Sequence, residues 1–116
     1  MNAPFDINEL RANIGDEPEI ERMLLTSFME SCSASLDWLQ TEFPITQNDS
    51  YDLTWKNHMH QIKGAALNIG AFGLQEATKH AEDHYQAALA VRKMLLSEVI
   101  TQFDVLQHFI RENSLA

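Results

Sequence analysis

Apolar residues recur every three to four positions along most of this 116-residue chain, and that spacing is typical of amphipathic α-helices. The four glycines and three prolines interrupt the pattern at only a few places. No segment alternates apolar and polar residues in the way that a half-buried strand would. The pattern therefore predicts an all-α fold: an antiparallel up-down four-helix bundle with a short additional N-terminal helix.

The first two helices have clear boundary signals. A short helix is expected over residues 7–14, because Asp6 can cap it and Gly15 can end it. A second helix is expected over about residues 18–41, where a proline occupies the first helical turn. The residues predicted to face the core on this second helix are Ile20, Leu24, Phe28, Ser31, Ser35, Trp38 and Leu39.

The remaining three helices are expected in the second half of the chain. The third begins at residue 49 or 50 and continues to residue 69, and the fourth begins after Gly73. No glycine or proline marks the break before the fifth helix, which we place near residues 89–92. The predicted inner positions of the last two helices are Leu74, Ala77, Ala81 and Tyr85, then Leu95, Val99, Phe103, Leu106 and Ile110.

Composition limits the class of protein. The length suits one domain over residues 1–116, and a single cysteine excludes an internal disulfide. Seventeen acidic against eight basic residues give a net charge of -9, which argues against nucleic acid and anionic membranes as partners. The N-terminus lacks the features of a signal peptide, so we expect a soluble, cytoplasmic protein. The initial methionine and the self-contained length favour a stand-alone protein.

The faces of the third helix separate its two histidines. Successive helical residues are rotated by about 100°, which places the centre of the apolar stripe roughly 140° from His60. His58 lies about 160° from His60, at the margin of that stripe, and is expected to be a partly buried structural side chain. The apolar stripe consists of Trp55, Met59, Ile62, Ala66 and Ile69. The residues within about 60° of His60 are Lys56, Lys63, Gly64 and Leu67.

The surroundings of His60 suggest a chemical role. A glycine inside a helix costs about 1 kcal/mol relative to alanine, so Gly64 suggests that something large must approach the ring one turn away. Lys56 and Lys63 suggest that the approaching group carries negative charge. A neutral imidazole is a competent nucleophile near neutral pH. A phosphoryl acceptor site is therefore plausible, and an ordinary solvated histidine remains the alternative from these residues alone.

The motif around His60 is similar to that of a known family. The run His60-Gln61-Ile62-Lys63-Gly64, with small residues and a second glycine after it, resembles the core motif of the histidine-containing phosphotransfer (HPt) domain family. The opening "FDINEL" and the segment "GLQEATKHAE" also resemble that family, and the resemblance spans about residues 5–110. The recurring residues of the second segment are Leu74, Ala77, Ala81 and Glu82. The departures from the family pattern are Met59, Ile62 and Ala65, and none removes a reactive group.

This resemblance implies a phosphorelay intermediate without catalytic turnover of its own. His60 would accept a phosphoryl group from the aspartyl phosphate of one receiver domain and pass it to another. Lys63 and Lys56 would offset the phosphate charge, and Gly64, Gln61 and Leu67 would serve access and docking. The receiver would supply the Mg²⁺, so no cofactor is expected in this chain. The implied partners are receiver domains of response regulators or of a hybrid histidine kinase, and we expect the chain to be monomeric.

Two rival interpretations stay open beside the resemblance. His80 and His84 are four residues apart, a spacing that can chelate a transition metal, which raises a metal-binding bundle as an alternative. The chain has no Glu-x-x-His pair of the kind found in di-iron bundles, and we assign no metal ligands. A docking module of the same fold that does not transfer phosphate is the second alternative. Cys32 is interpreted as a small core residue, and His108 receives no role.

Overall fold

The computed structural model describes residues 5–113 and 115 of the chain. Residues 1–4, 114 and 116, which include the initial methionine, lie outside this described part. All regular secondary structure in the described residues is helical. The helices are α1 (Ile7–Ile14), α2 (Pro18–Thr41), α3 (Asp49–Ile69), α4 (Phe72–Asp83) and α5 (Leu89–Glu112).

The ends of α1 and α3 follow from local chemistry. The Asp6 carboxylate accepts a hydrogen bond from the Asn8 backbone N–H at the start of α1. The Asn48 side chain accepts from the backbone N–H groups of Ser50 and Tyr51 at the start of α3. Both helices end at a glycine in the left-handed conformation, with φ of 78° at Gly15 and at Gly70, which other residues rarely adopt. These caps fix the boundaries of the helix that carries His60.

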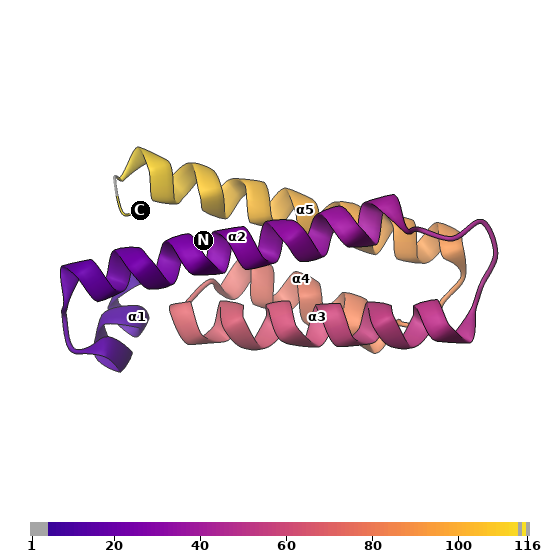
Figure 1. Ribbon diagram of the computed structural model, residues 1–116, viewed down its shortest axis with the longest axis horizontal. Helices are drawn as coiled ribbons and strands as arrows, with labels where there is room; N and C mark the ends of the chain where they lie inside the picture. The colour runs from indigo at the N-terminus through magenta and orange to yellow at the C-terminus, as the bar shows by residue number, and fades with distance from the viewer. Residues whose placement is uncertain (1–4, 114, 116) are drawn as a thin grey trace.

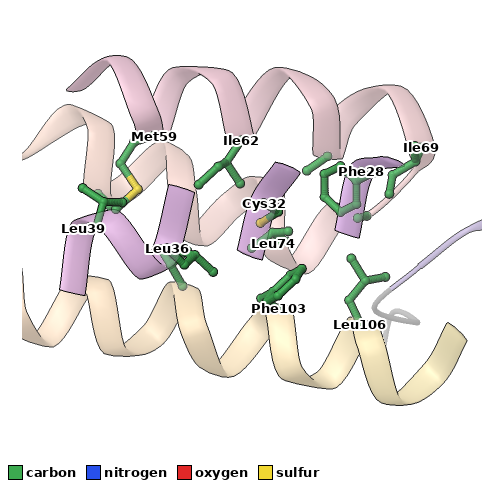
Figure 2. Close-up of a cluster of buried hydrophobic side chains, with 14 of the residues drawn as sticks. Phe28, Cys32, Leu36, Leu39, Met59, Ile62, Ile69, Leu74, Phe103 and Leu106 are labelled. Carbon is green, nitrogen blue, oxygen red and sulfur yellow. The ribbon is translucent and has the colours of Figure 1, made fainter. Parts of the chain in front are cut away.

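Four of the helices form an antiparallel up-down bundle, as the sequence predicted (Figure 1). Helix α3 packs most closely against α4, and α4 in turn packs against α5. Figure 2 shows apolar side chains from these helices meeting in the interior, among them Phe28, Cys32, Leu36, Met59, Ile62, Leu74, Phe103 and Leu106. Burying such side chains is the dominant favourable term in folding. No helix in the described part of the chain is long and apolar enough to span a membrane.

The predicted core face of α2 is wrong by about one position. Ile20 and Leu24 are 45% and 41% exposed, and Ser31 is exposed as well. Phe28 and Leu39 are buried as expected. The side chains that α2 buries are Glu21, Leu25, Phe28, Cys32, Leu36 and Leu39. Helix α2 has two neighbouring apolar rows, and periodicity alone does not show which of them the bundle covers.

The connection between the last two helices lies earlier than predicted. Helix α4 ends at Asp83, and α5 already begins at Leu89, so the connector is 84–88 and contains the expected inner residue Tyr85. Helix α4 also begins before Gly73, at Phe72. On α5 the fully packed position is Leu96, whereas the expected Leu95 is only partly buried.

A buried ion pair accounts for the position of the connector between α4 and α5. Arg92, whose side chain has no exposed surface, donates to an Asp52 carboxylate oxygen at 2.6 Å. The same nitrogen donates to the carbonyl oxygen of Tyr85 at 2.9 Å. A charge buried without a partner costs several kcal/mol, so Arg92 must sit in the first turn of α5, opposite α3. The connector therefore closes before it.

Helix α1 lies across the end of the bundle where α3 ends and α2 begins (Figure 1). The backbone N–H of Asp6 donates to the Gly70 carbonyl oxygen at 2.9 Å. The Asn13 side-chain amide donates to the Asn68 carbonyl oxygen at 3.1 Å. A Cβ at Gly70 would collide with the backbone of Asp6, so glycine is required there for packing as well as for its φ. These contacts hold α1 against the C-terminal end of α3.

Candidate functional site

His60 projects from the middle of α3 on the side away from the core. Its side chain is 69% exposed, while its neighbours Met59 and Ile62 point into the bundle (Figure 2). The difference arises from the 100° rotation between successive helical residues. The prediction that His60 lies on the solvent face of α3 is confirmed.

A carboxylate from α4 holds both His60 and Lys63. Oε1 of Glu82 lies 2.9 Å from Nδ1 of His60, and Oε2 lies 2.8 Å from Nζ of Lys63. Glu82 is buried because α4 runs antiparallel beside α3 and places this side chain between the two helices. A buried carboxylate requires cationic or hydrogen-bonding partners, and α3 supplies one to each of its oxygens.

The charge state of Glu82 determines which nitrogen of the neutral His60 ring carries the proton. Burial on its own raises the pKa of Glu82, but the contacts with Lys63 and His60 outweigh it, and the pKa is lowered from its ordinary value. Glu82 is therefore ionised near neutral pH and can only accept hydrogen bonds. In the neutral form of the His60 ring, Nδ1 must then carry the proton and donate it to Glu82, and the lone pair is on Nε2. The exposed nitrogen of the ring is thus the nucleophilic one.

The space around His60 is open on the side of Gly64. A Cβ added at Gly64 would meet no atom within 4 Å, apart from its own helix and chain neighbours. Neither packing nor backbone conformation requires glycine here, in contrast to Gly70. Leu67 lies on the same surface and keeps 50% of its area accessible, whereas Gln61 is exposed about 100° around α3 from His60, on the side of α2. Contacts within the described part of the chain therefore do not explain why position 64 is glycine and position 67 is leucine.

Lys56 is directed toward the connector that follows α4. Its Nζ lies 4.7 Å from the centre of the Tyr85 ring, the geometry of a cation–π contact. Such a contact at an exposed site is worth about 0.5–1 kcal/mol, so it orients the lysine only weakly. Of the two lysines predicted beside His60, the structure joins Lys63 to His60 through Glu82 and places Lys56 on Tyr85.

His58 has a different environment two residues earlier. Its ring stacks on Trp38 with 4.9 Å between ring centres, and its Nδ1 lies 3.1 Å from the Ser35 hydroxyl. Burial lowers the pKa of His58, which favours the neutral ring. The prediction of a partly buried structural histidine is confirmed.

The other candidate groups are not assembled into sites. The rings of His80 and His84 are 4.7 Å apart between centres, but Nδ1 of His84 bonds to the His80 carbonyl oxygen. Within residues 5–113 and 115, no group of three or more His, Cys, Asp or Glu residues could hold a metal ion. Cys32 is 3% exposed, and burial raises the pKa of its thiol to about 12, so it is an unreactive core residue.

Glu82 is a residue of the site to which no function was assigned from the sequence. It appeared only as a glutamate in the segment that resembles the family. A usable signal was present: Glu82 follows Thr78 by four residues and adjoins Ala81, so it lies on the inner face of an amphipathic helix. An acidic residue on such a face needs a partner, and pairing it with His60 requires knowing how α4 lies against α3.

Comparison with known protein families gives one match. Residues 23–112 match the model of the Hpt domain. The chain belongs to the Hpt domain family. Searches of curated proteins and of solved structures gave no match. Hpt domains are helical bundles that carry phosphoryl groups in two-component signalling and interact with receiver domains, and they are phosphocarriers rather than catalysts. The match begins within α2, so α1 lies outside it.

Proposed function

We propose that this chain is a histidine phosphotransfer protein that accepts a phosphoryl group on Nε2 of His60. The donor is the aspartyl phosphate of one receiver domain, and a second receiver takes the group onward. The observation that carries the proposal is the contact between Glu82 and Nδ1 of His60, since in the neutral ring it directs the proton to Nδ1 and leaves Nε2 as the nucleophile on an exposed side chain. Membership of the Hpt domain family supplies the class of reaction.

The chemical step needs no base in this chain. Nε2 of His60 attacks phosphorus, the Nε2–P bond forms, and the bond from phosphorus to the aspartyl oxygen breaks to release a carboxylate. Nδ1 keeps its proton, so the imidazole gains a positive charge as the group arrives. The Glu82 carboxylate stabilises that charge and fixes the ring orientation, as buried carboxylates do for reacting histidines elsewhere. Transfer then depends mainly on positioning and charge stabilisation.

Lys63 has two roles in this proposal. It contributes to the lowered pKa of Glu82, and its ammonium, which contacts the same carboxylate as His60, would offset charge on the incoming phosphoryl group. Lys56 is the second cation that would offset this charge, because its contact with Tyr85 is weak and can be broken when the phosphoryl group arrives. The Mg²⁺ that assists transfer belongs to the receiver, and this chain supplies no cofactor.

The face of α3 around His60 offers contacts for the receiver. Leu53 and Leu67 lie two turns before and two turns after His60, within about 20° of it around the helix, and are 57% and 50% exposed. Gly64 lies between His60 and Leu67 and leaves the approach to the ring unobstructed. The partners we propose for this face are receiver domains of response regulators or of a hybrid histidine kinase. In this proposal the chain binds them as a monomer in the cytoplasm.

The proposal is tested with two phosphoryl donors. The chain is incubated with phosphoramidate, a small donor that needs no protein docking, and separately with a panel of phosphorylated receivers. The expected result is one acid-labile phosphate per chain from phosphoramidate and transfer in both directions with at least one receiver. A chain that takes no phosphate from phosphoramidate, or that exchanges it with no receiver of its own cell, would contradict the proposal.

A further inference from the structure

The last turn of α4 contains a buried carbonyl group that needs a donor from another helix. The final carbonyl groups of an α-helix lack the N–H group that would follow four residues later. Helix α4 ends at Asp83, and the backbone N–H of Tyr85 donates to the Glu82 carbonyl oxygen at 3.3 Å, not to that of Ala81. Ala81 is fully buried, so water cannot serve as the donor to its carbonyl oxygen.

A tryptophan of α3 supplies this donor. Nε1 of Trp55 donates to the Ala81 carbonyl oxygen at 2.8 Å, and neither residue has exposed surface. An indole has one N–H donor and no acceptor, so this bond satisfies the polar group of the Trp55 side chain as well. A buried donor or acceptor that loses its partner pays the full cost of its desolvation. The bond therefore holds the end of α4 at one position along α3.

Two adjacent residues of α4 are thus held by α3 from opposite directions. The carbonyl groups of a helix point toward its C-terminus, whereas its side chains lean toward its N-terminus. Helix α4 runs antiparallel to α3, so the Ala81 carbonyl points back along α3 to Trp55. The Glu82 carboxylate leans the other way, to His60 and Lys63. These contacts lie on residues 55–63, about 12 Å along the axis of α3.

The chain that follows α4 is fixed to the same part of α3. One nitrogen of the buried Arg92 side chain donates to the Tyr85 carbonyl oxygen at 2.9 Å and to Asp52 at 2.6 Å. Asp52 lies three residues before Trp55, within one helical turn. The end of α4 therefore cannot slide along α3 without breaking a buried hydrogen bond.

The contact between Glu82 and His60 depends on this position. Oε1 of Glu82 lies 2.9 Å from Nδ1 of His60, and N–H···O hydrogen bonds extend only to about 3.2 Å. A shift of α4 by well under 1 Å is therefore enough to weaken it. The His60 side chain is 69% exposed, so packing in the core does not orient its ring in place of Glu82.

We propose that Trp55 is a positioning residue for phosphoryl transfer, because its indole N–H holds the Ala81 carbonyl and so places Glu82 against Nδ1 of His60. This inference rests on the proposed function, since the residue it positions is the one that orients the phosphoacceptor ring. It gives a residue of the core stripe, on the face of α3 away from His60, a part in the reaction.

The test separates the indole N–H from the bulk of the ring. Trp55→Phe keeps an aromatic side chain in the core and removes the donor to Ala81. Nitrogen NMR of the neutral His60 ring then reports which of its nitrogens carries the proton, in the parent and in the variant. We expect the share of rings protonated on Nδ1 to fall in Trp55→Phe toward the share in free histidine. Uptake from phosphoramidate should slow about fivefold, because a displaced catalytic contact lowers the rate.

The second tryptophan of the chain provides a matched control. Trp38 is partly buried on α2 and stacks on Tyr51 and His58. Trp38→Phe should lower the melting temperature and leave both the His60 protonation pattern and the uptake rate unchanged. A double variant tests whether Trp55 acts through Glu82. If it does, Trp55→Phe combined with Glu82→Ala slows uptake no further than Glu82→Ala alone.

The outcomes separate this inference from the proposed function. An unchanged His60 ring in Trp55→Phe, or a fivefold effect that persists in the absence of Glu82, would overturn the role of Trp55 while phosphate on His60 still supports the phosphocarrier. A parent that takes no phosphate from phosphoramidate would contradict the proposed function and with it any role of Trp55 in transfer. Should Trp55→Phe unfold, as judged by its thermal melt, all variants are compared in sucrose, which stabilises folded states.

Discussion

His58 and His60 stand two residues apart on the same helix, yet the bundle gives them opposite properties. His58 stacks on Trp38, and burial lowers its pKa, so its ring is held neutral and packed. His60 is open to solvent, and Glu82 holds its Nδ1. The partners that create this difference come from other helices, α2 for His58 and α4 for His60. A histidine therefore takes its role here from the face it occupies and from the neighbour across that face.

Replacing each histidine by glutamine tests the difference between His58 and His60 most strongly. We expect His60→Gln to lose all measurable phosphate uptake, because the substitution removes the ring nitrogen that forms the bond to phosphorus. His58→Gln should keep uptake but unfold more easily by about 1 kcal/mol, since stacking of an aromatic pair contributes about that much. Phosphate uptake with each donor and urea unfolding provide the two readouts. Retained uptake in His60→Gln would contradict the assignment.

Glu82 is expected to have the next largest effect. Glu82→Ala removes the group that accepts a hydrogen bond from Nδ1 and should slow uptake from phosphoramidate and from receivers alike by about 10- to 100-fold, the loss seen when a carboxylate that orients a metal-binding histidine is removed. Glu82→Gln can still accept a hydrogen bond from Nδ1 through its amide oxygen and should recover part of the rate. Single-turnover uptake with a thermal melt of each variant checks this. Equal rates in the parent and in Glu82→Ala would remove Glu82 from the mechanism.

Gly64 should affect protein docking more than chemistry. Gly64→Ala adds a Cβ that points into open space, so the helix should gain about 0.5–1 kcal/mol in stability. The same methyl group obstructs the approach to His60, and transfer from a receiver should slow several-fold more than uptake from phosphoramidate. Equal changes with both donors would show that clearance for a partner is not the reason for glycine at this position.

The smallest expected effect is a dependence of stability on pH that comes from His58. Its pKa in the folded chain is lowered by burial from the ordinary 6.5, so the unfolded chain binds a proton at this ring more readily. The stability that depends on a neutral ring is complete above pH 6.5 and is lost as the pH falls toward the folded pKa. We expect the urea midpoint of the parent to drop more than that of His58→Gln between pH 7.5 and pH 5.5. Parallel pH profiles would contradict this account.

Periodicity and capping were sufficient for most of the fold. The boundaries of α1, α2 and α3 were predictable because Asp6, Pro18 and Gly70 act locally, through neighbours in the sequence. The positions of His60 on the surface and His58 at the core margin were predictable for the same reason, because they follow from the rotation between successive residues of one helix. The connector at 84–88 was not predictable in this way, because its position depends on a buried pair between Arg92 and Asp52, forty residues apart.

Only the part of the candidate site that lies on α3 could be predicted from the sequence, for a related reason. His60, Lys63 and Gly64 lie within five residues, and helical geometry relates them directly. Glu82 reaches them from α4, so its role depends on packing between helices. The prediction for α2 failed in another way, because this helix has two neighbouring apolar rows. Leu24 was assigned to the core, although it is exposed and lines an open groove.

The central claim is that Nε2 of His60 carries the phosphoryl group while Nδ1 keeps its proton toward Glu82. The most direct test is nitrogen NMR of the chain labelled with ¹⁵N at its histidines, recorded before and after treatment with phosphoramidate. We expect that the ring of His60 alone changes, with phosphorus coupled to Nε2 and a protonated Nδ1, while His58 keeps its spectrum. Phosphorus on Nδ1 of His60, or on another histidine, would contradict it.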